Sequence, residues 1–160
     1  MKCWKETNSS LENDLTEHSN PGTQVTPHWS FWLIGGVTLL WNAMGAINFI
    51  VQMMPGTTEA YRASEQAIIT GRPVWATVGF FVAVVGGTAG SALLLLRNKL
   101  ALPFFLVSFV GVLIATLHTL TQGIQFGMGE IIGIIAMPML IAGLLVWYAK
   151  RAQVLGWIKS

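Results

Sequence analysis

The chain has 160 residues, of which 53% are hydrophobic and only 10% are charged, and its formal net charge is +2. Soluble domains carry about 25% charged residues. This composition therefore excludes a water-soluble globular domain and predicts an integral membrane protein. The small positive charge reflects a topological bias rather than a nucleic-acid-binding patch, and we expect no nucleic-acid partner.

The first 28 residues are polar and rich in Ser, Thr and Asn, so we predict a disordered cytoplasmic tail over residues 1–28. Four apolar blocks follow, and each is long enough to cross about 30 Å of hydrocarbon as a helix of about 20 residues. Such solid runs favour helices over a membrane β-barrel. We expect an all-α fold, an antiparallel bundle of transmembrane helices over residues 29–149, with spans at about 29–54, 74–96, 102–121 and 131–149.

The first block contains the stretch "LLWNAMGAINF", which places two asparagines among apolar residues. Asn42 lies near the bilayer centre on the same helical face as Gly45, and we expect its amide to hydrogen-bond a neighbouring helix where the glycine permits close approach. Asn48 and Gln52 are four residues apart and therefore share a face nearer the outer side.

The link between the first two blocks is the longest connection, residues 55–73. A Thr at its start and a Gly and Pro at its end predict a short helix lying along the outer membrane surface. The second block then carries a GxxxG from Gly86 to Gly90, with Gly87 beside it. Such glycines let helix backbones approach closely, either inside one chain or across a homodimer. The sequence leaves both alternatives open.

The fourth block contains Pro138, which is expected to kink the helix. It ends in residues 150–160, a basic and aromatic segment that we expect to lie at the membrane interface. Five Lys and Arg residues flank the predicted helices on one side, Arg97, Lys99, Lys150, Arg151 and Lys159. The other side has only Arg62 and Arg72, so the positive-inside rule places both termini in the cytoplasm.

With that orientation, several polar residues from different helices come to the same outer end. One interpretation is an outward-facing binding pocket in which a His118–Glu130 pair takes up or releases a proton. The other is that these residues are helix ends in contact with water. The residues of this candidate pocket are Asn48, Gln52, Arg72, His118, Gln122 and Glu130.

No HExxH, CxxC, GxSxG or Walker-type motif is present in the chain. The only two histidines near the predicted spans, His28 and His118, fall at opposite depths, which argues against a haem. We therefore expect no enzyme, no metal site, no catalytic residue and no cofactor.

The order of "LLWNAMGAINF", "GRPVWATVGFF", "GGTAGSALLLLRNKLALPFFLVSFVGV" and "WYAKRAQVLGW" resembles a group of small bacterial inner-membrane proteins. These proteins have four predicted spans and often bear the label "sugar transporter", but their function is not established. The resemblance covers roughly residues 30–157 and implies a multi-pass protein of the bacterial inner membrane. Its members often have Asp and Tyr where this chain has Asn48 and Phe49, which weakens an ion-coupled mechanism centred there.

Two functions follow as hypotheses. The first is a non-catalytic membrane module that acts through ligand binding or through a membrane-protein partner. The alternative is a small transporter of a small polar solute, which would require a homodimer because four helices enclose little space. The lipid bilayer is the partner expected in both cases.

Overall fold

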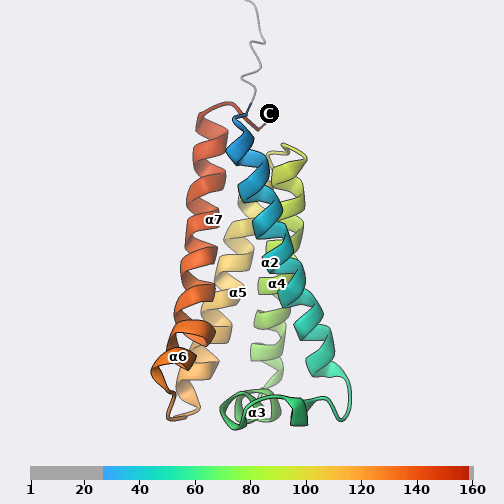
Figure 1. Cartoon of the computed structure of the whole chain (residues 1–160), viewed down its shortest axis with the longest axis vertical. Helices are drawn as coiled ribbons and strands as arrows, with labels where there is room; N and C mark the ends of the chain where they lie inside the picture. Colours follow the sequence, from blue (N-terminus) through green and yellow to red (C-terminus); the bar gives the residue numbers. More distant parts are fainter. Residues whose placement is uncertain (1–26, 159–160) are drawn as a thin grey trace, which may run out of the picture.

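The protein is a bundle of long apolar helices, seen here in a computed structural model that describes residues 27–158 (Figure 1). The tail predicted over residues 1–28 therefore lies outside the described residues, apart from Pro27 and His28. Four of the described helical stretches are long and apolar enough to cross a membrane, and they pack antiparallel, which confirms the predicted helical bundle. They are α2 (Trp29–Met53), α4 (Val74–Leu95), α5 (Ala101–Thr121) and a fourth composed of α6 (Met128–Glu130), the π-helical segment η2 (Ile131–Ala136) and α7 (Met137–Val154).

The centre of the bundle is the hairpin of α4 and α5, which share the most extensive helix contact in the described structure. Their close approach depends on small residues. A Cβ atom added to Gly90 would lie 2.8 Å from the Phe105 ring, and one added to Gly86 would lie 3.2 Å from Ser108 Cβ. Both glycines of the GxxxG are thus buried by α5 of the same chain. This packing excludes them as the face of a homodimer, one of the alternatives left open by the sequence.

The two outer helices pack on this hairpin, α2 mainly against α4 and α7 mainly against α5. They meet near the described N-terminus, where the Phe31 ring lies 6.4 Å from Tyr148 and 5.9 Å from Trp157 between ring centroids. Toward the other end, α2 and α7 diverge, and α3 (Ala63–Thr70) lies across that end of the bundle (Figure 1). We call these the termini end and the α3 end.

The termini end is closed by a hydrophobic core. Phe31, Leu94 and Ala149 are fully buried there, and Phe105 is 2% exposed. After α7, Gly156 adopts a left-handed conformation (φ +69°) that turns the chain back, and Ile158 packs into the same core. The first part of the predicted interfacial segment, residues 150–160, continues α7, and its last described residues help close the bundle.

The α3 end is held by polar contacts made by the long link. Thr58–Ala60 forms the 3₁₀ turn η1 before α3. The short helix predicted in this link is therefore present as two pieces, η1 and α3. The Tyr61 hydroxyl donates to Asn48 Oδ1 of α2 at 2.7 Å, and the Ser64 hydroxyl donates to Glu130 Oε1 of α6 at 2.5 Å. The link thus contacts both diverging helices.

Pro138 affects the fourth helix one turn before its own position. Proline lacks an N–H and crowds the preceding turn, and here that turn is π-helical: Met137 N–H bonds to Ile132 O, five residues earlier. The structure thus places a π-helical turn directly before Pro138, the residue at which the sequence predicts a kink.

Candidate functional site

A cavity of about 610 Å³ lies between the four helices and beneath α3. Its size falls within the range of about 300–1,000 Å³ that is usual for small-molecule sites. The inner part is mostly apolar, with walls from α4, α5 and α7 that include Ala83, Val112 and Leu145. It ends against Phe105, a residue of the closed core. The cavity thus reaches from the α3 end into the middle of the bundle.

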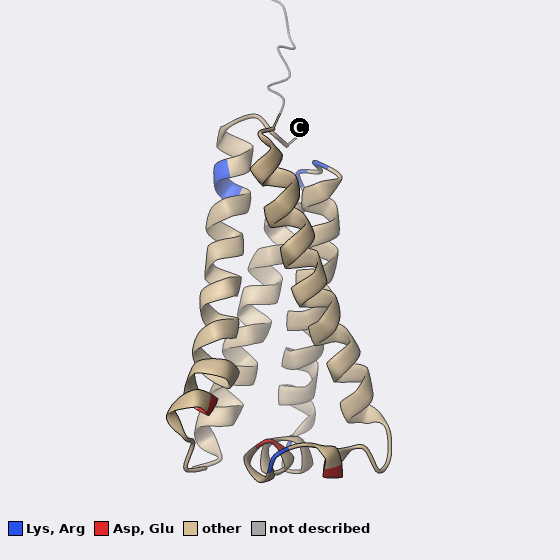
Figure 2. Cartoon of the chain, in the orientation of Figure 1, with Lys and Arg blue, Asp and Glu red and all other residues tan. Residues whose placement is uncertain are grey.

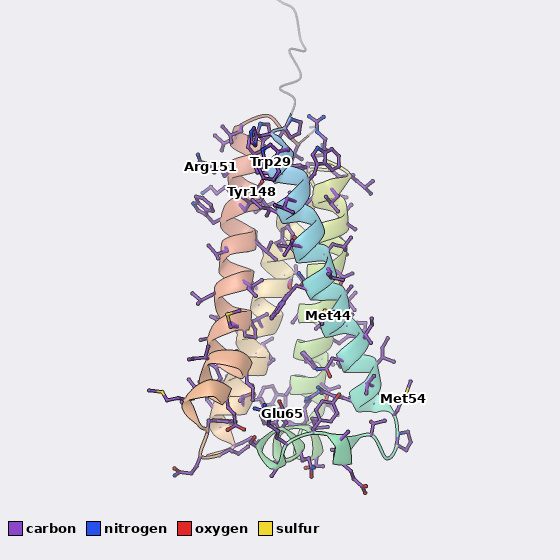
Figure 3. All side chains as sticks on the ribbon, in the orientation of Figure 1. Trp29, Met44, Met54, Glu65, Tyr148 and Arg151 are labelled. Carbon is purple, nitrogen blue, oxygen red and sulfur yellow. The ribbon has the colours of Figure 1, made fainter. Side chains whose placement is uncertain are left out.

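The cavity is open on the side where α2 and α7 diverge. Trp41 and Met44 of α2 line it and are 45% and 59% exposed. Opposite them, Gly133 of η2 lines the cavity and is also exposed. Figure 3 shows Met44 on α2 halfway along the bundle, and Glu65 among the side chains gathered above α3. The opening therefore lies along the side of the bundle, between candidate membrane spans, rather than at the α3 end.

Polar side chains gather at the α3 end of the cavity. Arg72, directly before α4, donates from Nη2 to Gln52 Oε1 of α2 at 2.7 Å. Its guanidinium also lies 5.0 Å from the centroid of the Phe80 ring. Such a cation–π contact partly compensates for lost hydration. Asn48, whose oxygen accepts from Tyr61, lies one helical turn before Gln52 on the same wall.

Arg72 is the only Lys or Arg among the described residues that line the cavity. One of the two terminal nitrogens of its guanidinium lacks a hydrogen-bond acceptor among the residues described. Its Nη1 atom is buried and has no hydrogen-bond partner within residues 27–158. Burial lowers the pKa of the Arg72 guanidinium because the charged form loses hydration, yet arginine stays protonated in proteins. A buried N–H donor without an acceptor is unfavourable unless an anion or a polar group reaches it.

His118 lies deep in the bundle at the same end and is 2% exposed. Its Nδ1 is 3.3 Å from Gln122 Nε2, its Nε2 is 3.5 Å from Ile68 O of α3, and Trp75 packs edge-on against its ring. The Gln122 amide therefore supports the histidine and does not line the cavity.

The proposed His118–Glu130 proton pair is not formed. Glu130 Oε1 accepts from Ser64, and its Oε2 accepts from the Gly127 N–H at 2.9 Å. These bonds hold the carboxylate beside α3, away from the cavity wall, while His118 faces Ile68 and Gln122. Depth along the helices was the basis of the expectation, and depth alone does not specify which side chains meet.

Asn42 marks the inner limit of the polar wall. Its Nδ2 donates to Thr38 O within α2 at 2.8 Å and approaches Ser91 Oγ of α4 at 3.4 Å. The close approach depends on Gly87, because a Cβ there would collide with Asn42 Oδ1. Gly45, the expected partner glycine, instead faces Val84 at an ordinary contact distance.

The structure therefore brings four of the six candidate pocket residues to one cavity, Asn48, Gln52, Arg72 and His118. It also adds lining residues that the sequence interpretation missed, of which Tyr61, Glu65 and Phe80 are the nearest to the polar end. Tyr61 and Glu65 belong to the link between α2 and α4. The only sequence signal that could have predicted them as lining residues is their position among apolar residues in the expected surface helix. Phe80 had no signal, because it is one aromatic residue in an apolar span.

The chemistry of the cavity is set by the side chains on its wall. No group of three or more His, Cys, Asp or Glu side chains capable of holding a metal occurs in the described part of the chain. The polar groups on the wall are amides, hydroxyls, the Arg72 guanidinium, the Glu65 carboxylate and the buried His118 imidazole, set in a largely apolar chamber. No protein-family model, curated protein or solved structure matches the chain.

Proposed function

We propose that this chain is a non-catalytic protein of the bacterial inner membrane that binds a small amphipathic molecule in its central cavity. The observation that carries the proposal is the cavity itself, about 610 Å³ in volume, apolar over most of its wall and polar at the α3 end. Mostly apolar pockets with a few convergent polar groups are the usual form of small-molecule sites. The resemblance to small four-span bacterial proteins supports the choice of membrane.

The distribution of charge supports an orientation with the termini in the cytoplasm. Figure 2 shows that the termini end carries Lys and Arg without Asp or Glu among the described residues, whereas the α3 end carries both signs. An excess of positive charge is typical of cytoplasmic loops. The cavity would then open into the outer leaflet of that membrane.

Transport of a polar solute, the alternative that follows from sequence, has less support from the packing. The core around Phe31, Leu94 and Phe105 closes the termini end, so a path across the membrane requires that these buried side chains separate. The GxxxG face that would have built a dimeric path is buried against α5. Binding from the bilayer requires neither change.

A cavity-blocking variant tests the proposal. A Cβ atom at Gly133 meets no atom within 4 Å, and Gly133 lines the cavity. We therefore expect Gly133→Phe to be tolerated and its ring to obstruct the opening. Gly129, four residues earlier, is equally unobstructed but does not line the cavity, so Gly129→Phe is the matched control.

The measurement is native mass spectrometry of protein extracted from membranes into uncharged micelles. We expect the wild type and Gly129→Phe to retain one bound amphiphile per chain, and Gly133→Phe to lose at least about nine-tenths of it. Equal retention in the two variants, or no bound small molecule in the wild type, would overturn the proposed function.

A further inference from the structure

We propose that the ligand of this cavity is an anionic amphiphile, whose carboxylate or phosphate binds Arg72 and whose single hydrocarbon chain extends along α4 and α5 to Phe105. This inference rests on the proposed binding function and names the chemical class of its ligand. It also assigns Arg72 as the residue that selects for charge.

The charge of the ligand follows from the surroundings of Arg72. Its Nη2 donates to a neutral amide oxygen of Gln52, and its Nη1 is buried with no acceptor among the residues described. The nearest acidic side chain on the cavity wall, Glu65, accepts from the Arg62 N–H at 3.2 Å, where it caps α3. A guanidinium fork with one arm unpaired is suited to an anionic oxygen, since charged hydrogen bonds of this kind are short and strong.

A second hydrogen-bond donor, on Asn48, lies at the polar end of the cavity. Tyr61 donates to the oxygen of Asn48, which leaves the amide nitrogen of Asn48 as a donor at the same end. Carboxylates and phosphates have several acceptor oxygens. The polar end thus offers donors from two places, Asn48 of α2 and Arg72 in the link before α4, to one anionic head group.

The length of the cavity matches one leaflet of a bilayer. Its wall runs along α2 from Gln52 to Asn42, an interval of ten residues and about 15 Å at about 1.5 Å per residue. That is half of a hydrocarbon core of about 30 Å. A lipid chain that enters sideways can therefore keep its head at the depth of Arg72 and its end near mid-bilayer, without turning over.

The entry route is the opening between α2 and α7. The exposed lining residues Trp41, Met44 and Gly133 border it. A hydrocarbon chain that passes between them exchanges the apolar bilayer for the apolar wall of the cavity. Its burial therefore contributes little hydrophobic free energy to binding. Selectivity and affinity must then come mainly from the head group, which makes the charge on Arg72 decisive.

The test compares three probes of equal chain length that differ only in the head: palmitate, palmityl alcohol and palmitylamine. Each is titrated into purified full-length protein in uncharged micelles, and the apparent Kd is taken from the rise in thermal unfolding midpoint. The variant is Arg72→Gln, which keeps an amide donor. Its control is Arg62→Gln, which removes an exposed arginine that does not line the cavity. Inorganic phosphate and acetate are titrated as chainless anions.

We expect palmitate to bind the wild type about 10- to 100-fold more tightly than palmityl alcohol or palmitylamine. Arg72→Gln should abolish this preference while leaving the affinity for the alcohol unchanged, and Arg62→Gln should retain it. Should the alcohol or the amine bind the wild type as tightly as palmitate, the anionic head group is refuted although the cavity still binds amphiphiles. Arg72-dependent binding of free phosphate or acetate that equals palmitate in affinity would refute the requirement for a chain. If none of the probes binds and Gly133→Phe loses no co-purified molecule, the proposed function fails as well.

Discussion

Gly111 of α5 is the position where a single methyl group should disturb the bundle most. A Cβ atom there would lie 2.6 Å from Ala83 N and 2.6 Å from Gly79 O, both backbone atoms of α4. Ordinary contact begins at 3.4 Å, so Gly111→Ala must move the two central helices apart by about 0.8 Å locally. A flexible side chain could yield to such a contact, but helix backbone cannot.

This displacement has a second effect next to Gly111. The Ser108 hydroxyl of α5 donates to Ala83 O of α4 at 2.6 Å. A shift of about 0.8 Å would stretch this bond to about 3.4 Å, beyond the usual 2.5–3.0 Å for O–H···O. Overpacking costs about 1–3 kcal/mol and a lost interhelical bond in a membrane about 0.6 kcal/mol. We expect the free energy of unfolding to fall by about 2–4 kcal/mol in total.

The measurement is reversible unfolding in mixed micelles, followed by circular dichroism. Gly129→Ala is the matched control, because a Cβ at Gly129 meets no atom within 4 Å and alanine is the better helix former by about 1 kcal/mol. If Gly111→Ala proves as stable as Gly129→Ala, the backbone contact between α4 and α5 is not as close as described, and the reasoning is refuted.

Two further substitutions test the polar contacts. Asn42→Ala removes the 3.4 Å contact with Ser91 Oγ. We expect it to lower the unfolding free energy by only about 0.6 kcal/mol, measured by the same unfolding experiment in mixed micelles. A loss above about 2 kcal/mol would show that Asn42 does more than adjust packing. Ser64→Ala removes the donor to Glu130 and should speed amide hydrogen exchange across Ala63–Thr70 several-fold. Thr70→Ala, which loses only a bond to Gln66 O within α3, should not; equal exchange in both variants would contradict a role for the Ser64–Glu130 bond in holding α3.

The membrane helices were predictable from sequence because length and apolarity are properties of a continuous run. The first span was expected over about 29–54 and is observed as Trp29–Met53; the second, expected over about 74–96, is Val74–Leu95. The fourth runs further than expected, to Val154, because Lys150 and Arg151 continue the helix instead of ending it. Charged side chains are compatible with a helix, so they mark the membrane boundary better than the helix boundary.

The candidate site was predictable only in part. Helix depth grouped Asn48, Gln52 and Arg72 at one end, since depth follows from position in each span, and all three line the cavity. Helix depth did not predict the position of the Glu130 carboxylate, which accepts a hydrogen bond from Ser64 of the link. The path of the link does not follow from the depth of the helices that it connects. Helix depth also missed Tyr61, which reaches Asn48 because the link folds back across the bundle. Rotation about a helix axis and the path of a long link arise from packing, which a single sequence does not display.

The two bonds made by the link have a thermodynamic consequence for the cavity. Tyr61 connects the link to α2 and Ser64 connects it to α6, so together they relate the positions of the two helices that border the opening. Any ligand that prefers one width of this opening must also favour the arrangement of α3 that goes with it. Coupling of this kind is reciprocal: a ligand that shifts the equilibrium of α3 toward its docked position by a given factor binds more tightly, by the same factor, when α3 is docked.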